Sequence, residues 1–258
     1  GKFLFFVTIS LSWFALFNSH NLMAMIFAPL FGVWVLFWLY KENSWNKIPK
    51  IVLSGVWALG LSAFFTIPVF LEQKYVQVET LVVGYYEYIA HFADTNQLLF
   101  SRYWGYGASA WLSNDQMSFQ IGHIHWITTL VVLIFVVRRI IKTKKIETLD
   151  IIILGFLLAG WFAAFMIHSR STPIWQVLDK FLKFVQFPWR FLSLVILCFS
   201  FVAGSITYLL GERRGFIKFM ILILLSTSLI FFNLDYFKPE KIGALTDKEK
   251  FSGVAWDM

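Results

Sequence analysis

The sequence is dominated by long blocks of apolar residues separated by short polar segments. A helix of about 20 apolar residues crosses the roughly 30 Å hydrocarbon core of a bilayer. Backbone polar groups in lipid must be satisfied within the segment, so helix is the expected state of each block. About seven blocks predict transmembrane spans, at residues 3–17, 22–40, 51–71, 121–137, 151–167, 191–210 and 216–232.

The composition supports this class. The chain of 258 residues is 59% hydrophobic and only 14% charged, whereas a soluble domain has roughly 45–50% apolar and about 25% charged residues. Such a chain has too little polar surface to cover a globule in water. We therefore predict an all-α, polytopic transmembrane helix bundle over residues 1–232, with interfacial helices and an extended outer loop. Residues 233–258 are expected to begin an external region.

The distribution of basic residues predicts the orientation. The net charge is +7, but 12 of the 22 Lys and Arg residues lie at Lys2 and in the segments 41–50, 138–150 and 211–218. Short basic loops between spans are typically cytoplasmic. The loops 72–120 and 168–190 and the tail should then face outward. This pattern predicts a multi-pass protein of the plasma (inner) membrane with the bilayer, and no nucleic acid, as its partner.

Two local features refine the expected helices. Pro68 should kink the third span near its outer end, because proline removes a backbone hydrogen bond. Apolar residues at 81, 85, 88, 89 and 92 have the spacing of one helical face, which predicts an amphipathic interfacial helix at about 80–100. A second interfacial helix is expected from Thr172 to about residue 185.

Several kinds of active site have no support in the sequence. The nucleophile elbow, the phosphate-binding loop, the dinucleotide fingerprint and the HExxH motif do not occur. The single cysteine, Cys198, lies inside an apolar block, which excludes a disulfide framework within the chain. His123 and His125 are two residues apart on a predicted helix and point to different sides, so we predict no metal site there.

Polar candidates for a site gather at the outer ends of the blocks. Glu72 ends the third block, where an ionisable group is costly unless it has a partner or a role. It is our candidate for a catalytic base, although a solvated loop charge is the simpler interpretation. Carboxylates of this loop would also suit a divalent cation, the one cofactor that we consider.

The outer arginines and aromatic residues are candidates for substrate binding. Arg102 and Arg190 are flanked by aromatic residues, and an arginine can bind phosphate through two hydrogen bonds. Arg190 could equally anchor the sixth span at the headgroup level. The other candidates for binding a sugar or a phosphate are His20, Asn21, Trp104, Tyr106, Gln186 and Trp189.

Five segments together carry a resemblance to a known family: SHNLMAMIFAPL, PVFLEQKYVQVETL, HFADTNQLLFSRYWGYGAS, QMSFQIGHIHW and VQFPWRFL. They resemble the bacterial polytopic membrane domains labelled "6-pyruvoyl-tetrahydropterin synthase-related", which are similar to the GT-C glycosyltransferase superfamily. The resemblance covers most of the chain, and WGYG and VQFPWRFL are its most specific parts. Pterin chemistry itself is not expected, since it needs a histidine zinc site on a β-rich fold.

The resemblance implies transfer of a sugar from a polyprenyl-phosphate donor to a cell-envelope acceptor on the outer face. GT-C enzymes usually carry an acidic residue in the first external loop, after the first span. The sequence is expected to open inside a later helix, so the catalytic base is expected upstream of Gly1. Two alternatives stay open: a transporter or flippase of lipid-linked intermediates, and a non-catalytic scaffold subunit. The centres of the blocks are almost free of charge, which favours an interfacial site over a conduction path.

Overall fold

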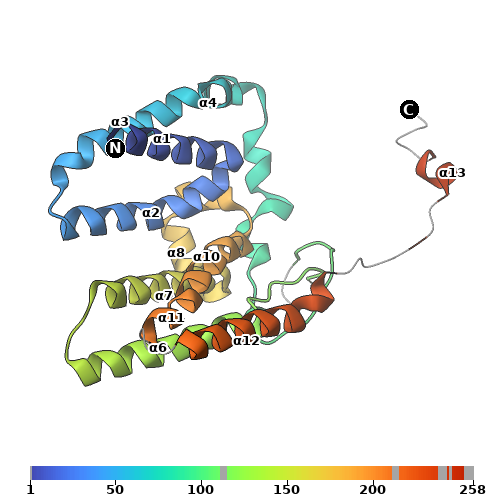
Figure 1. The fold of residues 1–258 in the computed structure, drawn as a ribbon. Coiled ribbons are helices and arrows are strands. Elements are labelled where there is room, and N and C mark those ends of the chain that lie inside the picture. Colours follow the sequence, from blue (N-terminus) through green and yellow to red (C-terminus); the bar gives the residue numbers. More distant parts are fainter. Residues whose placement is uncertain (1, 111–114, 211–214, 238–242, 244–245, 253–258) are drawn as a thin grey trace.

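The structure, a computed structural model, describes residues 2–110, 115–210, 215–237, 243 and 246–252. These residues form helices and connecting segments, with two isolated β-bridges (Ala93 with His168, and Tyr106 with Met117) and no strand. Figure 1 shows the long helices running back and forth between two ends of the molecule. The prediction of an all-α helix bundle is confirmed.

The helices of the spans coincide with the predicted apolar blocks. They are α1 (Lys2–Ser19), α2 (Asn21–Lys41), α3 (Ile48–Leu61), α4 (Ala63–Glu72), α6 (His123–Thr143), α7 (Thr148–Ile167), α10 (Leu192–Gly204), α11 (Ile206–Leu209) and α12 (Gly215–Asn233). The short α11 completes the span that α10 begins. Among the described residues, five helical segments are long and apolar enough to cross a membrane, and six if the bent pair around Ser62 counts as one span. The apolar part of α1, Phe3–Ser19, is shorter. The chain is therefore a multi-pass membrane protein.

Short helices and turns connect the long ones. They are η1 (Trp45–Lys47), η2 (Gln73–Tyr75), η3 (Val78–Val82), η4 (Gly84–Tyr86), η5 (Tyr88–His91), α5 (Thr95–Leu99), η7 (Ser169–Ser171), α8 (Thr172–Val177), α9 (Asp179–Leu182), η8 (Lys183–Val185), η9 (Pro188–Phe191), η11 (Leu234–Tyr236) and α13 (Asp247–Lys250).

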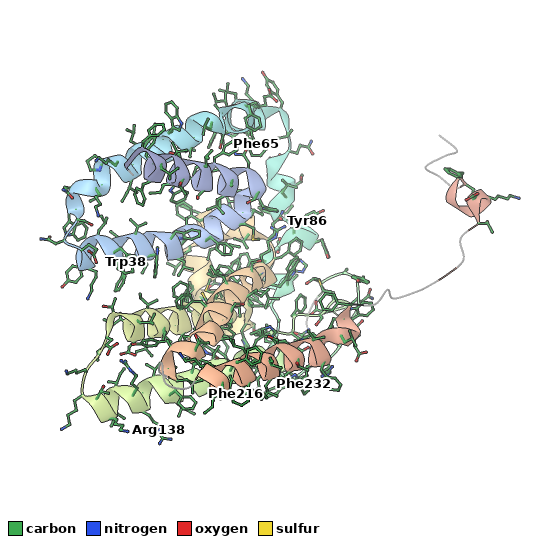
Figure 2. The ribbon with its side chains drawn as sticks, viewed as in Figure 1. Trp38, Phe65, Tyr86, Arg138, Phe216 and Phe232 are labelled. Carbon is green, nitrogen blue, oxygen red and sulfur yellow. The ribbon has the colours of Figure 1, made fainter. Side chains whose placement is uncertain are left out.

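The two ends of the bundle differ in character. The α2–α3 and α6–α7 connections lie at one end, and residues 73–110 and 115–122 lie at the other (Figure 1). Residues 168–191 join the second end, because the backbone N–H of Ala93 donates to the carbonyl of Ile167 at 3.0 Å. We call the first the basic end, and we call residues 73–110, 115–122 and 168–191 the cap. In Figure 2, Arg138 lies toward the basic end, and Tyr86 and Phe232 lie toward the cap.

The bend in the third apolar block is not where proline predicts it. The axis turns by 74° between Leu61 and Ala63, whereas Pro68 lies inside α4. The break falls at Gly60 and Ser62, a combination at which helices commonly kink. Ser62 is fully buried, and its hydroxyl accepts a hydrogen bond from Asn18 of α1 at 2.8 Å. A contact between helices therefore stabilises the break.

The continuous interfacial helix predicted at about 80–100 is wrong. The segment forms three short 3-10 turns, η3 to η5, followed by the five-residue helix α5. Gly84 has a φ of +61°, a left-handed conformation that interrupts any helix. The segment from Thr172 to residue 185 likewise breaks into α8, α9 and η8. The cap is thus built of short helices and turns, which side-chain contacts hold together.

Packing inside the cap is continuous with the helix ends beneath it. One buried cluster joins Ile26 of α2 and Leu194 of α10 to Phe92 and Trp175 of the cap. Trp175 is fully buried, its indole N–H donates to the carbonyl of Met166 at 3.0 Å, and its ring stacks on Tyr88. Because the cap shares a core with α2, α7 and α10, it is a fixed part of the fold.

A charged cluster closes the basic end. Helix α6 runs to Thr143, beyond its predicted end at residue 137, so Arg139 is helical. Its guanidinium donates to both oxygens of Asp150 and pairs with Glu147 at 2.5 Å. The hydroxyl of Tyr208 donates to Glu147, also at 2.5 Å. Asp150 is fully buried, and the cluster ties α6, α7 and α11 together.

Candidate functional site

Two of the predicted binding residues hold the end of α12. Arg102 donates through Nη2 to the carbonyl of Phe232 at 3.0 Å, and its guanidinium lies over the ring of Phe232. The indole N–H of Trp104 donates to the carbonyl of Tyr236 at 3.1 Å. The Tyr236 hydroxyl in turn donates to the side chain of Gln120. These contacts anchor the cap on α12, and a role in phosphate binding stays a prediction.

Arg190 lies at a junction between the two cap segments. Its Nη1 donates to the carbonyl of Val185 at 2.7 Å and to the side-chain oxygen of Gln186 at 3.1 Å. Gln186 has a φ of +63°, and its amide donates to the carbonyl of Leu81 at 2.6 Å. Trp189 follows, with a buried indole nitrogen that has no hydrogen-bond partner in the described residues. Arg190 and Gln186 therefore stabilise the cap through hydrogen bonds inside it.

The remaining predicted residues are spread over the cap end of the bundle. Glu72 is exposed at the end of α4 and makes no hydrogen bond or ion pair with the described residues. His20 is the N-cap of α2, where Nδ1 accepts from the N–H of Leu22 at 3.2 Å. Tyr106 is 69% exposed beside Trp104. The side chain of Asn21 lies outside the described residues. The structure does not gather these groups into one site.

A different set of ionisable residues lies near the bridge between the two cap segments. Ala93 pairs with His168, which places Asp94 and Arg170 within electrostatic range of the imidazole. Nδ1 of His168 accepts from the N–H of Arg170 at 3.1 Å, so the neutral ring carries its proton on Nε2. Partial burial, and then the charge of Arg170, lower the pKa of His168, while Asp94 opposes them.

This acid–imidazole–guanidinium group, Asp94, His168 and Arg170, is the main feature of the site that the candidates chosen from the sequence missed. Asp94 and Arg170 are exposed, and His168 is partly exposed. Asp94 also caps α5, where its Oδ1 accepts from the N–H of Gln97 at 2.7 Å. The one sequence signal of this group is a His-Ser-Arg run directly after an apolar block, and nothing in the sequence pairs that run with Asp94.

Other polar groups of the cap are engaged in its internal structure. His91 is buried, with Nε2 against the carbonyl of Tyr85 and Nδ1 2.9 Å from the hydroxyl of Ser109. A carbonyl only accepts, so Nε2 carries the proton and Nδ1 accepts from Ser109. Asp115 accepts from the N–H of Ala110 and from Gln97, both at 2.7 Å. These groups hold the turns of the cap together.

The described residues offer no ready cation site. No three His, Cys, Asp or Glu side chains among them are grouped so that they could hold a metal ion. The divalent cation considered from the loop carboxylates therefore has no set of three protein ligands in that part of the chain.

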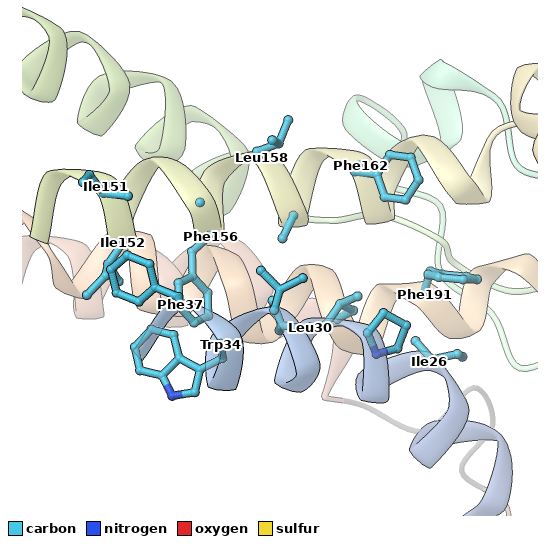
Figure 3. Close-up of a pocket in the computed structure, with 15 residues that line it drawn as sticks. Ile26, Leu30, Trp34, Phe37, Ile151, Ile152, Phe156, Leu158, Phe162 and Phe191 are labelled. Atoms are coloured by element: carbon cyan, nitrogen blue, oxygen red, sulfur yellow. The ribbon is translucent and has the colours of Figure 1, made fainter. Parts of the chain in front are cut away.

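An apolar groove lies beneath the cap, between α2 and α7 (Figure 3). Its volume is about 580 Å³. The lining is formed by Ile26, Pro29, Leu30, Val33, Trp34, Phe37, Ile151, Ile152, Gly155, Phe156, Leu158, Ala159, Phe162, Phe191 and Leu194. Every one of these side chains is apolar. Sequence reasoning missed the groove, because all the blocks are similarly apolar and their pairing is a tertiary property.

The groove and the ionisable group share one buried core. Ile26, Phe191 and Leu194 line the groove and also belong to the buried cluster under the cap. Ala93 and Ile167, the neighbours of Asp94 and His168, belong to the same cluster. The groove and the ionisable group thus both border this core.

Comparison with known proteins adds no relative: no family model matches the chain, and neither does any curated protein or solved structure. The resemblance to the pterin synthase-related membrane domains therefore stays a prediction.

Proposed function

We propose that the protein is a glycosyltransferase-like membrane protein that moves a sugar from a polyprenyl-phosphate donor to a cell-envelope acceptor at the cap end. The apolar groove between α2 and α7 is the observation that carries this proposal. A polyprenyl phosphate has a long apolar tail and an anionic head, and it needs both environments at one place. The groove offers an apolar environment at membrane depth, and the cap above it offers ionisable groups for the anionic head.

The chemistry would use the groups that the structure brings together. The carboxylate of Asp94 takes the proton of the acceptor hydroxyl as that oxygen attacks the anomeric carbon. The bond between the sugar and the phosphate breaks, and the electron pair leaves with the polyprenyl phosphate. Arg170 and the Nε2–H of His168 stabilise the charge of the departing phosphate. Glu72, Arg102 and Arg190 are the competing candidates from the sequence.

Binding of the tail is tested with a matched pair of substitutions. Gly155 lines the groove, whereas Gly32 of α2 does not, and an added Cβ at either position has nothing within 4 Å. Gly155→Trp should fill the groove and weaken binding of a polyprenyl monophosphate by at least about tenfold, or about 1.4 kcal/mol. Gly32→Trp should leave binding unchanged. Native mass spectrometry of the protein in nanodiscs measures binding to both variants. Equal binding by the two would refute the groove as the site of the polyprenyl tail.

Catalysis is tested separately. Asp94→Asn should lower sugar transfer by about 10²–10⁴-fold, as loss of a general base does, while binding of the polyprenyl monophosphate persists. Glu72→Gln is the matched control on the second carboxylate. If Glu72→Gln abolishes transfer and Asp94→Asn does not, the base is Glu72, and the assignment to Asp94 is wrong.

One observation favours the second candidate, a transporter or flippase of lipid-linked intermediates. The bent pair α3–α4 is a broken helix, and transporters form their substrate sites at such breaks. Cysteines placed along α3 and α7 in a Cys198→Ala background separate the two functions. A transporter should let membrane-impermeant reagents label mid-helix positions from both sides, whereas an interfacial transferase should not.

A further inference from the structure

Helix α4, which leads into the cap, is apolar and exposed along its whole length. None of its residues is buried. Its exposed apolar side chains point in several directions around the axis, and Phe64, Ile67, Phe70 and Leu71 are 71%, 53%, 72% and 66% exposed. An amphipathic surface helix would have one polar face, and α4 has none. Its surroundings must therefore be apolar on nearly every side.

The polar groups of α4 do not contradict an apolar environment. The hydroxyl of Thr66 donates to the carbonyl of Ser62 at 3.1 Å, so it is satisfied within the helix. Glu72 is the last residue, at the end that leads into the cap. Just beyond it, the ammonium of Lys74 lies over the exposed ring of Tyr75. Lysine and tyrosine are residues that settle at the level of lipid headgroups.

The geometry of the bend decides how α4 lies in that environment. The segment before it, Trp45–Leu61, would be about 25 Å long at 1.5 Å per residue, which already crosses most of a hydrocarbon core of about 30 Å. Helix α3 packs along α1, so it follows the direction of the bundle. The 74° turn then sends α4 sideways, toward the plane of the membrane.

We propose that α4 lies in the plane of the membrane, embedded in the lipid leaflet at the cap end, and that lipid is its partner around most of its surface. Helix α3, which precedes it, also exposes apolar side chains, among them Val52, Val56 and Leu59. The third apolar block is then a span formed by η1 and α3, followed by an anchor for the first residues of the cap. This inference is independent of the proposed function.

Depth measurements along the two helices test the proposal. Positions 64 and 71 are seven residues apart, about 10 Å along the axis of α4. If α4 continued the span, their depths would differ by nearly that amount. At 74° to an upright α3 the difference is only about 3 Å, and it stays below about 7 Å if α3 tilts by roughly 20°.

The experiment uses single cysteines at 64, 67 and 71, each carrying a fluorescent label, in a Cys198→Ala chain reconstituted into phosphatidylcholine vesicles. Lipids with a nitroxide at shallow or deep acyl positions quench the label and report its depth. Cysteines at 52, 56 and 59 of α3 are the matched controls and should show a gradient of about 10 Å. We expect efficient quenching at nearly one depth along α4.

Two outcomes would overturn the proposal. A gradient along α4 as steep as that along α3 would make α4 the second half of a broken span. Labels on α4 that no lipid nitroxide quenches, while those on α3 are quenched, would show that protein covers the helix instead. Neither outcome depends on polyprenyl phosphate binding, so a failure here is distinguishable from a failure of the proposed function.

Discussion

The packing of α7 on α10 at Gly160 makes a sharp prediction about two glycines on one helix. A Cβ added at Gly160 would lie 2.6 and 2.7 Å from ring carbons of Phe199 and 2.9 Å from the Cβ of Cys198. Carbon atoms prefer separations of about 3.5–4.0 Å. At Gly155, five residues earlier, an added Cβ meets nothing within 4 Å. The same change, glycine to alanine, should therefore have opposite effects at the two positions.

The expected magnitude follows from how little the neighbours can move. Phe199 is 1% exposed, with its ring packed near Trp161, and the Cβ of Cys198 is fixed to the backbone of α10. Overpacking typically costs about 1–3 kcal/mol, and we expect the upper half of that range here. Alanine recovers about 0.5–1 kcal/mol of helix stability. Gly160→Ala should then lower the free energy of unfolding by about 1–2.5 kcal/mol, while Gly155→Ala raises it by about 0.5–1 kcal/mol.

Reversible unfolding in mixed micelles, followed by circular dichroism as a denaturing detergent is titrated, measures both variants. Phe199→Leu provides the coupling control, because a smaller side chain leaves room for the added methyl group. The double variant should be more stable than the sum of the two single changes predicts, by at least about 0.5 kcal/mol. If Gly160→Ala is as stable as the parent, or if Gly155→Ala loses as much as Gly160→Ala, the packing of α7 on α10 is not as described.

Three further predictions concern the two ends of the bundle. Asp150→Ala should cost about 3 kcal/mol in the same unfolding assay, the low end for a broken buried ion pair, because Arg139 keeps some contact with solvent; Arg139→Lys, which keeps the charge, should cost less. Trp104→Phe removes the donor to the carbonyl of Tyr236. The free energy of local opening at the end of α12 should fall by about 1 kcal/mol, which speeds hydrogen exchange there, while the global free energy of unfolding stays nearly unchanged. The pKa of His168 is lowered in the folded protein, so the unfolded chain binds a proton more readily. The contribution of neutral His168 to the free energy of unfolding should be fully present above pH 6.5, the ordinary pKa of histidine, and should be lost as the pH falls below it. Melting curves between about pH 8 and about pH 5 should show this loss, and His168→Gln should reduce it.

Much of the fold was predictable because hydropathy and length are local properties. The blocks from Leu22 to Tyr40 and from Ile151 to Ile167 coincide closely with α2 and α7. The described basic segments 41–50 and 138–150 lie at one end of the bundle (Figure 1), as charge counting requires of alternating spans, although the assignment of that end to the cytoplasm stays a prediction. Periodicity failed in the cap, where Gly84 and contacts over long sequence distances override the apolar spacing at 81–92.

The candidate site was predictable only in its composition. Aromatic and charged residues do gather at the cap end, yet Arg102 and Arg190 bind carbonyls of the protein itself. Asp94 and His168 could not be paired from the sequence, because 74 positions separate them and a single backbone bridge joins them.

What the sequence alone determined is the class of the protein: apolar segments long enough to cross a bilayer must become helices, since lipid offers no hydrogen bonds to an open backbone. The tertiary structure decided where the third block bends, which polar groups meet in the cap, and where a groove remains between α2 and α7. Those outcomes depend on which helix faces which, and side chains of nearly uniform apolarity do not specify their neighbours by hydropathy. Close packing does, as Gly160 against Phe199 and Asn18 against Ser62 illustrate.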